Sequence, residues 1–440
     1  MTTFDCVIVG GGFTGLSAAL EITASGRSCV IFESDDAVGG LASGFDVGGY
    51  ELEKFYHHWF TSDHHITDVV RQIGKSDQIV TRPSKTGMYF SGDFYRLSTP
   101  LDLLRFRALP FLDRIRTGIA TLSLRGIKDW KKLESVTAKS WLESTFGRTS
   151  YKVLWEPLLV GKFGEYADEV SAVWFWKKLA LRGASRGKQG GEQLAYYLGG
   201  FAQLARDIAA RVAAQGGEIR TATRVLSIQP GEAGQLEVKT ASGTVSARTV
   251  LITTPLPIAA DLLENAVPAE FSMQLRRVRY LSNVCLILSL DRSLSETYWL
   301  NVNDPSFPFV GIIEHTNFEP PESYGGKHIV FLSRYLPPSE AVYRMSADEL
   351  LEYAIPHIQA MFPAFDRTWI NAHYVWKADY AQPIVERHYS KYVPGLDTPL
   401  QGVKIATMAQ VYPEDRGTNY AVREGFASAK RILSSLSAID

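Results

Sequence analysis

Three glycines near the start of the chain have the spacing of a loop that holds a phosphate group. Gly10, Gly12 and Gly15 lie between an apolar run rich in β-branched residues, 5–9, and apolar positions at helical spacing over 16–23. The first glycine permits a tight turn, the second lets the backbone approach a pyrophosphate, and the third allows close helix–strand packing. The helix offers free N–H groups and a positive dipole end to the phosphates. We therefore expect a dinucleotide-binding loop.

Glu33 supplies the carboxylate that such a loop needs for the sugar of the dinucleotide. It stands 18 residues after Gly15, at the end of a second apolar strand predicted over 28–32. A carboxylate here accepts hydrogen bonds from ribose hydroxyls and repels a 2′-phosphate, which argues against NADP. The pair Gly39-Gly40 can bring more backbone to the pyrophosphate. The backbone of Val225 could lie along the edge of the adenine, or Val225 could simply pack in the core. No second Gly-x-Gly-x-x-Gly follows a later strand, so we expect one dinucleotide.

The elements around these residues predict an α/β fold assembled from separated stretches of chain. The region from Tyr50 to about residue 195 is irregular, aromatic-rich and mostly helical by pattern, and a helix follows Gly199-Gly200. The further predicted elements are strands at 219–221, 225–228, 236–240, 244–247, 250–253, 284–290, 329–333 and 403–408, and helices at 347–361 and 418–433. We expect a Rossmann-like cofactor domain, of the glutathione-reductase type, formed by 1–80, 195–265 and 400–440, and an inserted α+β substrate domain formed by 81–194 and 266–399.

Composition excludes several classes of protein. The chain has 440 residues, 45% of them hydrophobic and 21% charged, as in ordinary globular proteins. The 46 Lys and Arg residues nearly balance the 47 Asp and Glu residues, so we expect no nucleic-acid partner. No transmembrane segment and no signal peptide is predicted. Three cysteines do not make a disulfide framework, and we expect a cytoplasmic protein.

Several of these motifs together resemble the FAD-dependent flavoprotein amine-oxidase superfamily. They are 6–33, the step from Glu33 to Gly39-Gly40, the pairs Gly199-Gly200 and Gly216-Gly217, 250–255 and 405–425. This superfamily includes protoporphyrinogen oxidases, phytoene-type desaturases and, more distantly, UDP-galactopyranose mutases. The resemblance covers roughly the third of the chain that forms the cofactor domain. Leu41 departs from the pattern, because many members carry Arg after the glycine pair.

The resemblance implies FAD as the cofactor and places residues around it. The residues expected to bind FAD are Gly10, Gly12, Phe13, Thr14, Gly15, Glu33, Gly40, Leu41, Tyr56, Val225, Gly417, Asn419 and Tyr420. The loop from Pro413 to Tyr420 would pass the pyrophosphate and the flavin ring.

The segment Glu51–His58 is expected to face the flavin and carries unusual chemistry for this place. His57 can exchange a proton near neutral pH, and Lys54 can stabilise negative charge on a reduced flavin. We predict catalytic roles for His57, Lys54 and Arg416; the alternative for the segment is a turn with aromatic packing. Adjacent histidines on an extended chain point to opposite faces, so we expect no metal site at 57–58 or 64–65.

Two further stretches suggest surfaces for apolar or charged partners. The apolar and aromatic residues at 155–164 and 174–176, followed by Arg182, Arg186 and Lys188, fit an apolar cleft with a cationic rim, or a solvated loop. The stretch Leu101–Lys132 combines eight Lys and Arg with three Asp and interleaved apolar residues. Such a stretch fits peripheral contact with the inner face of the cell membrane, and an ordinary packed helix pair explains it nearly as well.

The leading functional hypothesis is an oxidoreductase that moves a hydride between flavin N5 and a bulky substrate. The substrate is expected to be isoprenoid or lipid-linked, and the reaction a dehydrogenation, desaturation or reduction. Without an NAD(P)H domain, the electron partner would be oxygen, a quinone or a diffusing carrier. The alternatives are a sugar isomerase, like UDP-galactopyranose mutase, that uses reduced FAD with no net redox change, and a flavin-binding protein without catalysis.

Overall fold

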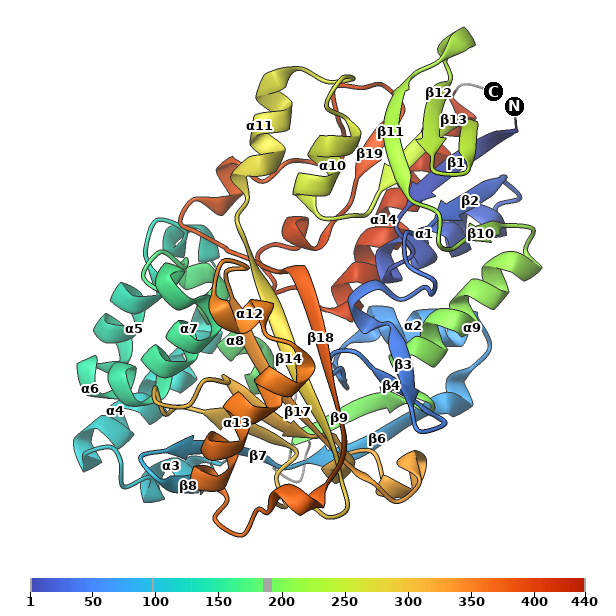
Figure 1. The fold of residues 1–440 in the computed structure, drawn as a ribbon. Coiled ribbons are helices and arrows are strands. Elements are labelled where there is room, and N and C mark those ends of the chain that lie inside the picture. Colours follow the sequence, from blue (N-terminus) through green and yellow to red (C-terminus); the bar gives the residue numbers. More distant parts are fainter. Residues whose placement is uncertain (1, 97–98, 128, 185–191, 439–440) are drawn as a thin grey trace.

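Two large sheets organise the molecule (Figure 1). The computed structural model describes residues 2–96, 99–127, 129–184 and 192–438. In this part of the chain the first sheet has the strand order β10-β2-β1-β13-β12-β11, and β19 pairs with the far end of β13. Its strands are β1 (Thr3–Val9), β2 (Cys29–Phe32), β10 (Glu218–Arg220), β11 (Val225–Pro230), β12 (Leu236–Thr240), β13 (Gly243–Ile252) and β19 (Val403–Ile405).

The parallel part of this sheet is buried, as the apolar runs require. In β1 the residues Val7 and Ile8 are fully buried, and Ile8 aligns with Ile31 on one neighbour and Leu251 on the other. Helices α1 (Phe13–Ala24), α9 (Gly200–Ala214) and α14 (Thr418–Ser437) lie together beside the sheet (Figure 1). The helices α1 and α14 touch closely at Gly425, where a Cβ would stand 2.4 Å from the Thr14 carbonyl oxygen.

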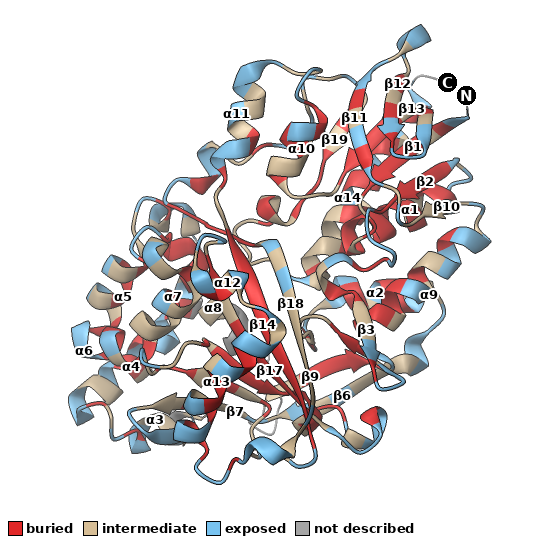
Figure 2. Cartoon of the chain, in the orientation of Figure 1, coloured by how far each residue is buried: buried red, intermediate tan, exposed pale blue. Residues whose placement is uncertain are grey.

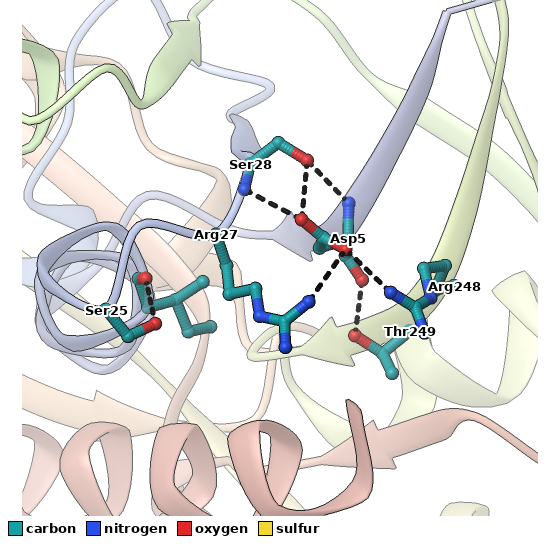
Figure 3. Close-up of polar contacts among 7 residues, drawn as sticks. Asp5, Ser25, Arg27, Ser28, Arg248 and Thr249 are labelled. Atoms are coloured by element: carbon teal, nitrogen blue, oxygen red, sulfur yellow. Dashed lines mark hydrogen bonds and ion pairs between the residues drawn. The ribbon is translucent and has the colours of Figure 1, made fainter. Parts of the chain in front are cut away.

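A polar cluster lies at the end of these strands that is opposite to the glycine loop (Figure 3). The Asp5 carboxylate accepts hydrogen bonds from the Ser28 backbone N–H at 3.0 Å and from the Arg248 guanidinium at 3.2 Å. The Thr249 hydroxyl donates to the Asp5 carbonyl oxygen at 2.8 Å, and Arg27 stands 3.8 Å from the carboxylate. Burial opposes ionisation, yet these contacts hold the pKa of Asp5 below its usual value. The cluster therefore ties β1, β2 and β13 together.

The second sheet carries the strand order β18-β14-β17-β16-β15-β7-β8. Long antiparallel strands form its centre, and helix α13 (Ala347–Met361) packs on one face. Figure 2 shows that the central strands of both sheets are mostly buried. The strands are β7 (Thr86–Phe90), β8 (Asp93–Arg96), β14 (Tyr280–Leu290), β15 (Trp299–Val302), β16 (Gly311–Glu314), β17 (His328–Leu336) and β18 (Ile370–Pro383).

A lobe of helices lies beside the second sheet (Figure 1), and its buried residues form one core with those of the first sheet. It consists of α3 (Pro100–Arg105), α4 (Phe111–Ser123), α5 (Ala138–Phe146), α6 (Arg148–Ser150), α7 (Glu156–Phe163) and α8 (Ala172–Ala184). Two small sheets complete the strands: β3 (Gly44–Val47) pairs with β4 (Tyr50–Glu53), and β9 (Glu192–Tyr197) lies between β5 (Trp59–Phe60) and β6 (Ile79–Ser84). The other α-helices are α2 (His64–Gln72), α10 (Leu256–Leu262), α11 (Ala269–Arg277) and α12 (Ala341–Arg344). None of the described helices is both long enough and apolar enough to cross a membrane.

The α/β class is confirmed, and three details of the sequence prediction are wrong. Residues 50–96 form more strand than helix, and the sequence does not show this because their short strands pair with distant segments such as β9 and β15. The two strands predicted at 244–247 and 250–253 form one strand, β13, which continues through Arg248 while it changes neighbours from β12 to β19. The strand β18 has no predicted counterpart, since its polar residues and glutamine interrupt the apolar pattern.

Candidate active site

The three glycines adopt the geometry that their spacing predicts. Gly10 has a φ of 109°, and Gly12 stands at the N-terminal end of α1 with extended backbone and no side-chain cap. A Cβ on Gly15 would lie 2.1 Å from the Gly10 carbonyl oxygen, so only glycine allows this packing of the helix on the loop. A Cβ on Gly12 would meet nothing within 4 Å. Gly12 therefore faces open space at a bare helix N-terminus.

The second glycine pair closes onto the first. The Gly39 N–H donates to the Gly11 carbonyl oxygen at 2.9 Å, and a Cβ on Gly40 would lie 3.4 Å from the Gly12 Cα. Gly39 and Gly40 both have positive φ angles, 117° and 58°. Leu41 continues the short turn that begins at Gly40, beside this contact. Two glycine-rich backbones thus lie face to face.

Glu33 is 8% exposed and is held beside the loop. Its Oε2 accepts from the Gly11 N–H at 2.7 Å, and its Oε1 accepts from the Asp35 N–H at 3.0 Å. The Thr223 N–H donates to the Glu33 carbonyl oxygen, which brings the start of β11 alongside. Val225, two residues later, is buried in the core beside this point. The structure therefore brings the predicted ribose and adenine residues to the same edge as the glycine loop.

The C-terminal segment begins α14 at a second bare helix N-terminus. Gly417 is the N-cap residue with extended backbone and no side-chain cap, and the first turn of α14 carries no acid. The Asn419 side chain accepts from the Ile66 N–H at 3.1 Å, so it ties α14 to α2. Tyr420 is half-buried, with the Arg423 guanidinium over its ring. Phe13 and Thr14 are buried in α1, where the Phe13 ring packs on Phe201.

Arg416 forms the centre of a polar cluster against the second sheet. Its guanidinium donates to Gln382 Oε1 at 3.0 Å and to the Tyr335 hydroxyl at 2.8 Å. These partners come from β18 and β17, so the cation is held at one place. Tyr56 lies beside the same cluster, where burial and Tyr335 raise the pKa of its hydroxyl well above the usual value.

His57 is neutral and keeps one ring nitrogen available. Its Nδ1 lies 2.7 Å from the Phe55 carbonyl oxygen, which can only accept, so Nδ1 carries the proton. Burial lowers the pKa of His57 to about 4, and the charge of Arg416 acts in the same direction. Its Nε2 has no hydrogen-bond partner in the part of the chain that the structure describes. The nitrogen can accept a proton or a hydrogen bond from a ligand.

The segment that carries His57 is fixed from behind by a buried acid. Glu53 accepts from the Tyr196 hydroxyl at 2.6 Å and from the Phe201 N–H at 2.8 Å. Burial raises the pKa of Glu53, and these two hydrogen bonds act against that rise. Lys54, the next residue, extends to the Trp376 ring, with Nζ 4.6 Å from its centroid. The structure therefore places Lys54 on the face of β18, whereas its predicted catalytic role is untested.

An ion-pair network anchors the loop before Arg416 to the helical lobe. Asp415 accepts from the Trp174 indole at 2.8 Å and lies 3.0 Å from Lys178 and 3.6 Å from Lys162. Burial alone would raise the pKa of Asp415, but the nearby cations hold it far below its usual value. Glu414 pairs in turn with Lys177 at 3.2 Å.

The predicted apolar cleft of the helical lobe is a packed core instead. The side chains of Trp174, Phe175 and Trp176 are only 3–7% exposed and pack with Leu159 and Phe163. Aromatic residues at helical spacing fill the space between α5, α7 and α8, so they do not line a cleft. Of the predicted cationic rim, the side chain of Arg182 and the residues Arg186 and Lys188 lie outside the described part.

The two histidine pairs differ in structure. His57 and His58 lie in an extended segment, while His64 and His65 begin helix α2 and are exposed. His58 pairs with the Tyr298 hydroxyl at 2.9 Å. Among the described residues no group of three or more His, Cys, Asp or Glu side chains is placed to hold a metal ion.

Comparisons with known proteins agree with this geometry. The model of the family of flavin containing amine oxidoreductases matches residues 13–433. A Synechococcus elongatus protein that bears the name zeta-carotene desaturase is 25% identical over 174 residues, 34% of this chain and 36% of that protein. The chloroplastic protoporphyrinogen oxidase of Nicotiana tabacum is 24% identical over 291 residues, 59% of this chain and 52% of the relative. The chain thus matches only about a third to a half of the length of these relatives.

Solved structures extend the likeness to the whole fold. A protein from an Exiguobacterium species that bears the name protoporphyrinogen oxidase aligns with a TM-score of 0.76 over 98% of both chains, at 18% identity. At this identity the likeness shows the fold alone. The family match covers most of the chain, which confirms the predicted family and, at the level of that family, the class of flavin-dependent oxidoreductases. The protein belongs to the flavin containing amine oxidoreductase family.

Proposed function

We propose that the protein is an FAD-dependent oxidoreductase that moves a hydride equivalent between flavin N5 and a carbon atom of a bulky, largely apolar substrate. The observation that carries the proposal is the open space at Gly12, where a bare helix N-terminus meets the Gly39-Gly40 backbone. None of the described side chains blocks this place, and backbone N–H groups with a positive dipole end suit a pyrophosphate.

The residues present fit FAD at each part of the molecule. The Gly12 loop and Gly40 would hold the pyrophosphate, and Glu33 would accept from the ribose hydroxyls. Among the described residues, the Glu33 carboxylate has no cation as a partner, which favours an unphosphorylated ribose. The second bare N-terminus, at Gly417, would accept a further polar edge of the cofactor.

When bound, FAD supplies the hydride chemistry, and the protein supplies position, charge and proton handling. Arg416 is held by Gln382 and Tyr335, so it offers a fixed positive charge beside His57. The neutral His57 ring can hold a proton at Nε2 while Nδ1 remains bonded to the Phe55 carbonyl oxygen. Lys54 and Tyr56 would complete the polar wall on this side.

An isoprenoid or lipid-linked substrate is the class that the surroundings support. Next to Lys54, the Trp376 and Tyr374 rings of β18 pack against Phe45, each with centroids 5.0 Å from it. Two relatives bear the names zeta-carotene desaturase and protoporphyrinogen oxidase, so their names give a carotene and a porphyrinogen as substrates. Oxygen, a quinone or a diffusing carrier would accept the electrons.

The experiment that tests the proposal starts with the purified protein. We expect a flavin absorbance spectrum, about one FAD released per chain, and an isoprenoid or lipid among the small molecules that copurify. Release of NAD, or no flavin after supplementation with FAD, would overturn the cofactor assignment. Turnover of a sugar nucleotide only with pre-reduced flavin, without net consumption of an oxidant, would replace the hydride-transfer reaction by the mutase-like alternative.

A further inference from the structure

Helix α4 presents its apolar side chains to solvent instead of to the core. Leu112 is 80% exposed, Leu122 69%, Ile119 65% and Phe111 62%. Of the twelve large apolar side chains that are exposed in the described part of the chain, seven fall between Leu101 and Leu122. Concentration of this kind in one short stretch differs from the scattered exposure that is normal on a protein surface.

The exposed residues form one stripe along the helix. At 100° per residue, positions 111, 122, 115, 119 and 112 fall within about 100° of one another. Thr117 and Ala120, on the other side, are buried against the lobe. Beside the stripe is an open hollow of about 450 Å³ lined by Leu112, Ile115, Ile119 and Arg116 among others. The lobe therefore keeps its own core, and the stripe is additional apolar surface.

Arginines flank the stripe on both sides. On the helical wheel Arg114 and Arg116 stand beyond its two edges, and Arg105 and Arg107 are exposed on the adjoining helix α3 and its loop. No ion pair joins any of these four arginines to an acid within the described residues. Arg114 donates to the Leu104 and Leu109 carbonyl oxygens and Arg116 to Ser144 and Thr145, so both cations are positioned by backbone.

We propose that the outward face of α4 binds an anionic phospholipid bilayer, with the apolar stripe in the acyl boundary and the flanking arginines at the headgroups. An apolar stripe flanked by unpaired cations complements such a surface in both polarity and charge. A second protein copy would leave four positive charges facing four others across a symmetric contact, which disfavours self-association. The placement of α4 at the outer edge of the helical lobe leaves the face accessible (Figure 1).

The test is flotation of the holoprotein with vesicles of two compositions. We expect binding to vesicles of equal parts phosphatidylcholine and phosphatidylglycerol, weaker binding to pure phosphatidylcholine, and loss of binding when salt rises from about 0.05 M to about 0.5 M. The double variant Arg105→Ser, Arg107→Ser should lower partition to the anionic vesicles roughly 30-fold. Arg114 and Arg116 are left unchanged, because their backbone hydrogen bonds support the lobe.

A second variant separates the apolar part of the interaction. Leu112→Ser with Ile119→Ser should lower partition by at least about tenfold, with flavin content and melting temperature unchanged, since both side chains are exposed. Met273→Ser is the matched control at 62% exposure, on α11 at the other end of the molecule from α4 (Figure 1), and should bind as the wild type does. Equal binding by wild type and both double variants, no binding by the wild type, or a dimer in light scattering that the apolar double variant dissociates would each overturn the proposal.

Discussion

Gly12 and Gly15 belong to one motif, yet the structure predicts opposite consequences when each is changed. Gly12 has a φ of −72° and open space around its missing Cβ, so Gly12→Val should fold normally. Its side chain would instead occupy the volume that the pyrophosphate needs. If two backbone hydrogen bonds to a charged phosphate are lost, each contributes about 1.5–3 kcal/mol. The dissociation constant of FAD should then rise roughly 10²- to 10⁴-fold.

Gly15→Ala is the matched control for damage to the fold. The new Cβ would lie 2.1 Å from a backbone oxygen, Gly10 O, and 3.2 Å from Ile8 Cγ2, so α1 must move away from β1. Overpacking of this kind costs about 1–3 kcal/mol or more. At a few degrees per kcal/mol, the melting temperature of the FAD-free protein should fall by about 2–10 °C.

The assay measures flavin content after purification, FAD affinity by quenching of flavin fluorescence, and melting of the FAD-free protein. The expected pattern is lost affinity with an unchanged melting temperature for Gly12→Val, and a lowered melting temperature for Gly15→Ala. Normal FAD affinity in Gly12→Val would show that the phosphates bind elsewhere. An equal loss of melting temperature in both variants would show that Gly12 is a structural glycine only.

Glu33→Ala should weaken the binding of FAD by about 1–3 kcal/mol in equilibrium titration, while Glu33→Gln, whose side chain still accepts from the Gly11 N–H, should lose less binding free energy. Equal FAD affinity in the wild type and both variants would remove Glu33 from the site. His57→Ala should keep FAD and slow flavin reduction or reoxidation roughly ten- to a thousand-fold by stopped flow, and His64→Ala, exposed on α2, should change nothing; matched rates in wild type and His57→Ala leave His57 as packing. Burial lowers the pKa of His57 in the folded protein to about 4, below its ordinary value of 6.5, so between these two pH values only the unfolded chain binds a proton at His57. The contribution of His57 to the free energy of unfolding should therefore be full above pH 6.5 and fall by up to about 3 kcal/mol as the pH drops to 4. Urea titrations should show a smaller slope for His57→Ala. Asp415→Ala should destabilise the protein by about 3–5 kcal/mol, because it leaves Lys162 buried without its partner acid; a melting curve like that of the wild type would show that the pair contributes little.

The geometry of the glycine loop and of Glu33 was predictable because its sequence signals are local. A strand, three glycines, a helix and an acid follow one another within 33 residues, and the spacing of the glycines specifies the conformation of the backbone. The helices at 347–361 and 418–433 were found for a similar reason, since apolar residues recur at helical spacing over several turns. Local periodicity therefore recovers the framework, and the ends of its elements to within a few residues.

The partners of Arg416 could not be predicted in this way. Gln382 lies 34 residues before it and Tyr335 lies 81 residues before it, in strands whose pairing depends on tertiary contacts. A lone glutamine at the end of β18 and a tyrosine in β17 carry no signal of their own, because only the register of the sheet aims them at one point. The same is true of Lys162, whose bond to Asp415 spans more than half of the chain.

The loop that ends in Arg416 contacts the helical lobe, the second sheet and helix α14, whose relative positions matter for catalysis. Three successive residues bind three different partners: Glu414 pairs with Lys177 of α8, Asp415 with Lys162 of α7, and Arg416 with the second sheet. The next residue, Gly417, is the N-cap of α14, which packs on the glycine-loop helix α1. Two acids followed by a cation in one short loop cannot exchange partners without burying an unpaired ion, which costs several kcal/mol. The loop therefore fixes the position of α14 and α1 relative to the helical lobe and the second sheet.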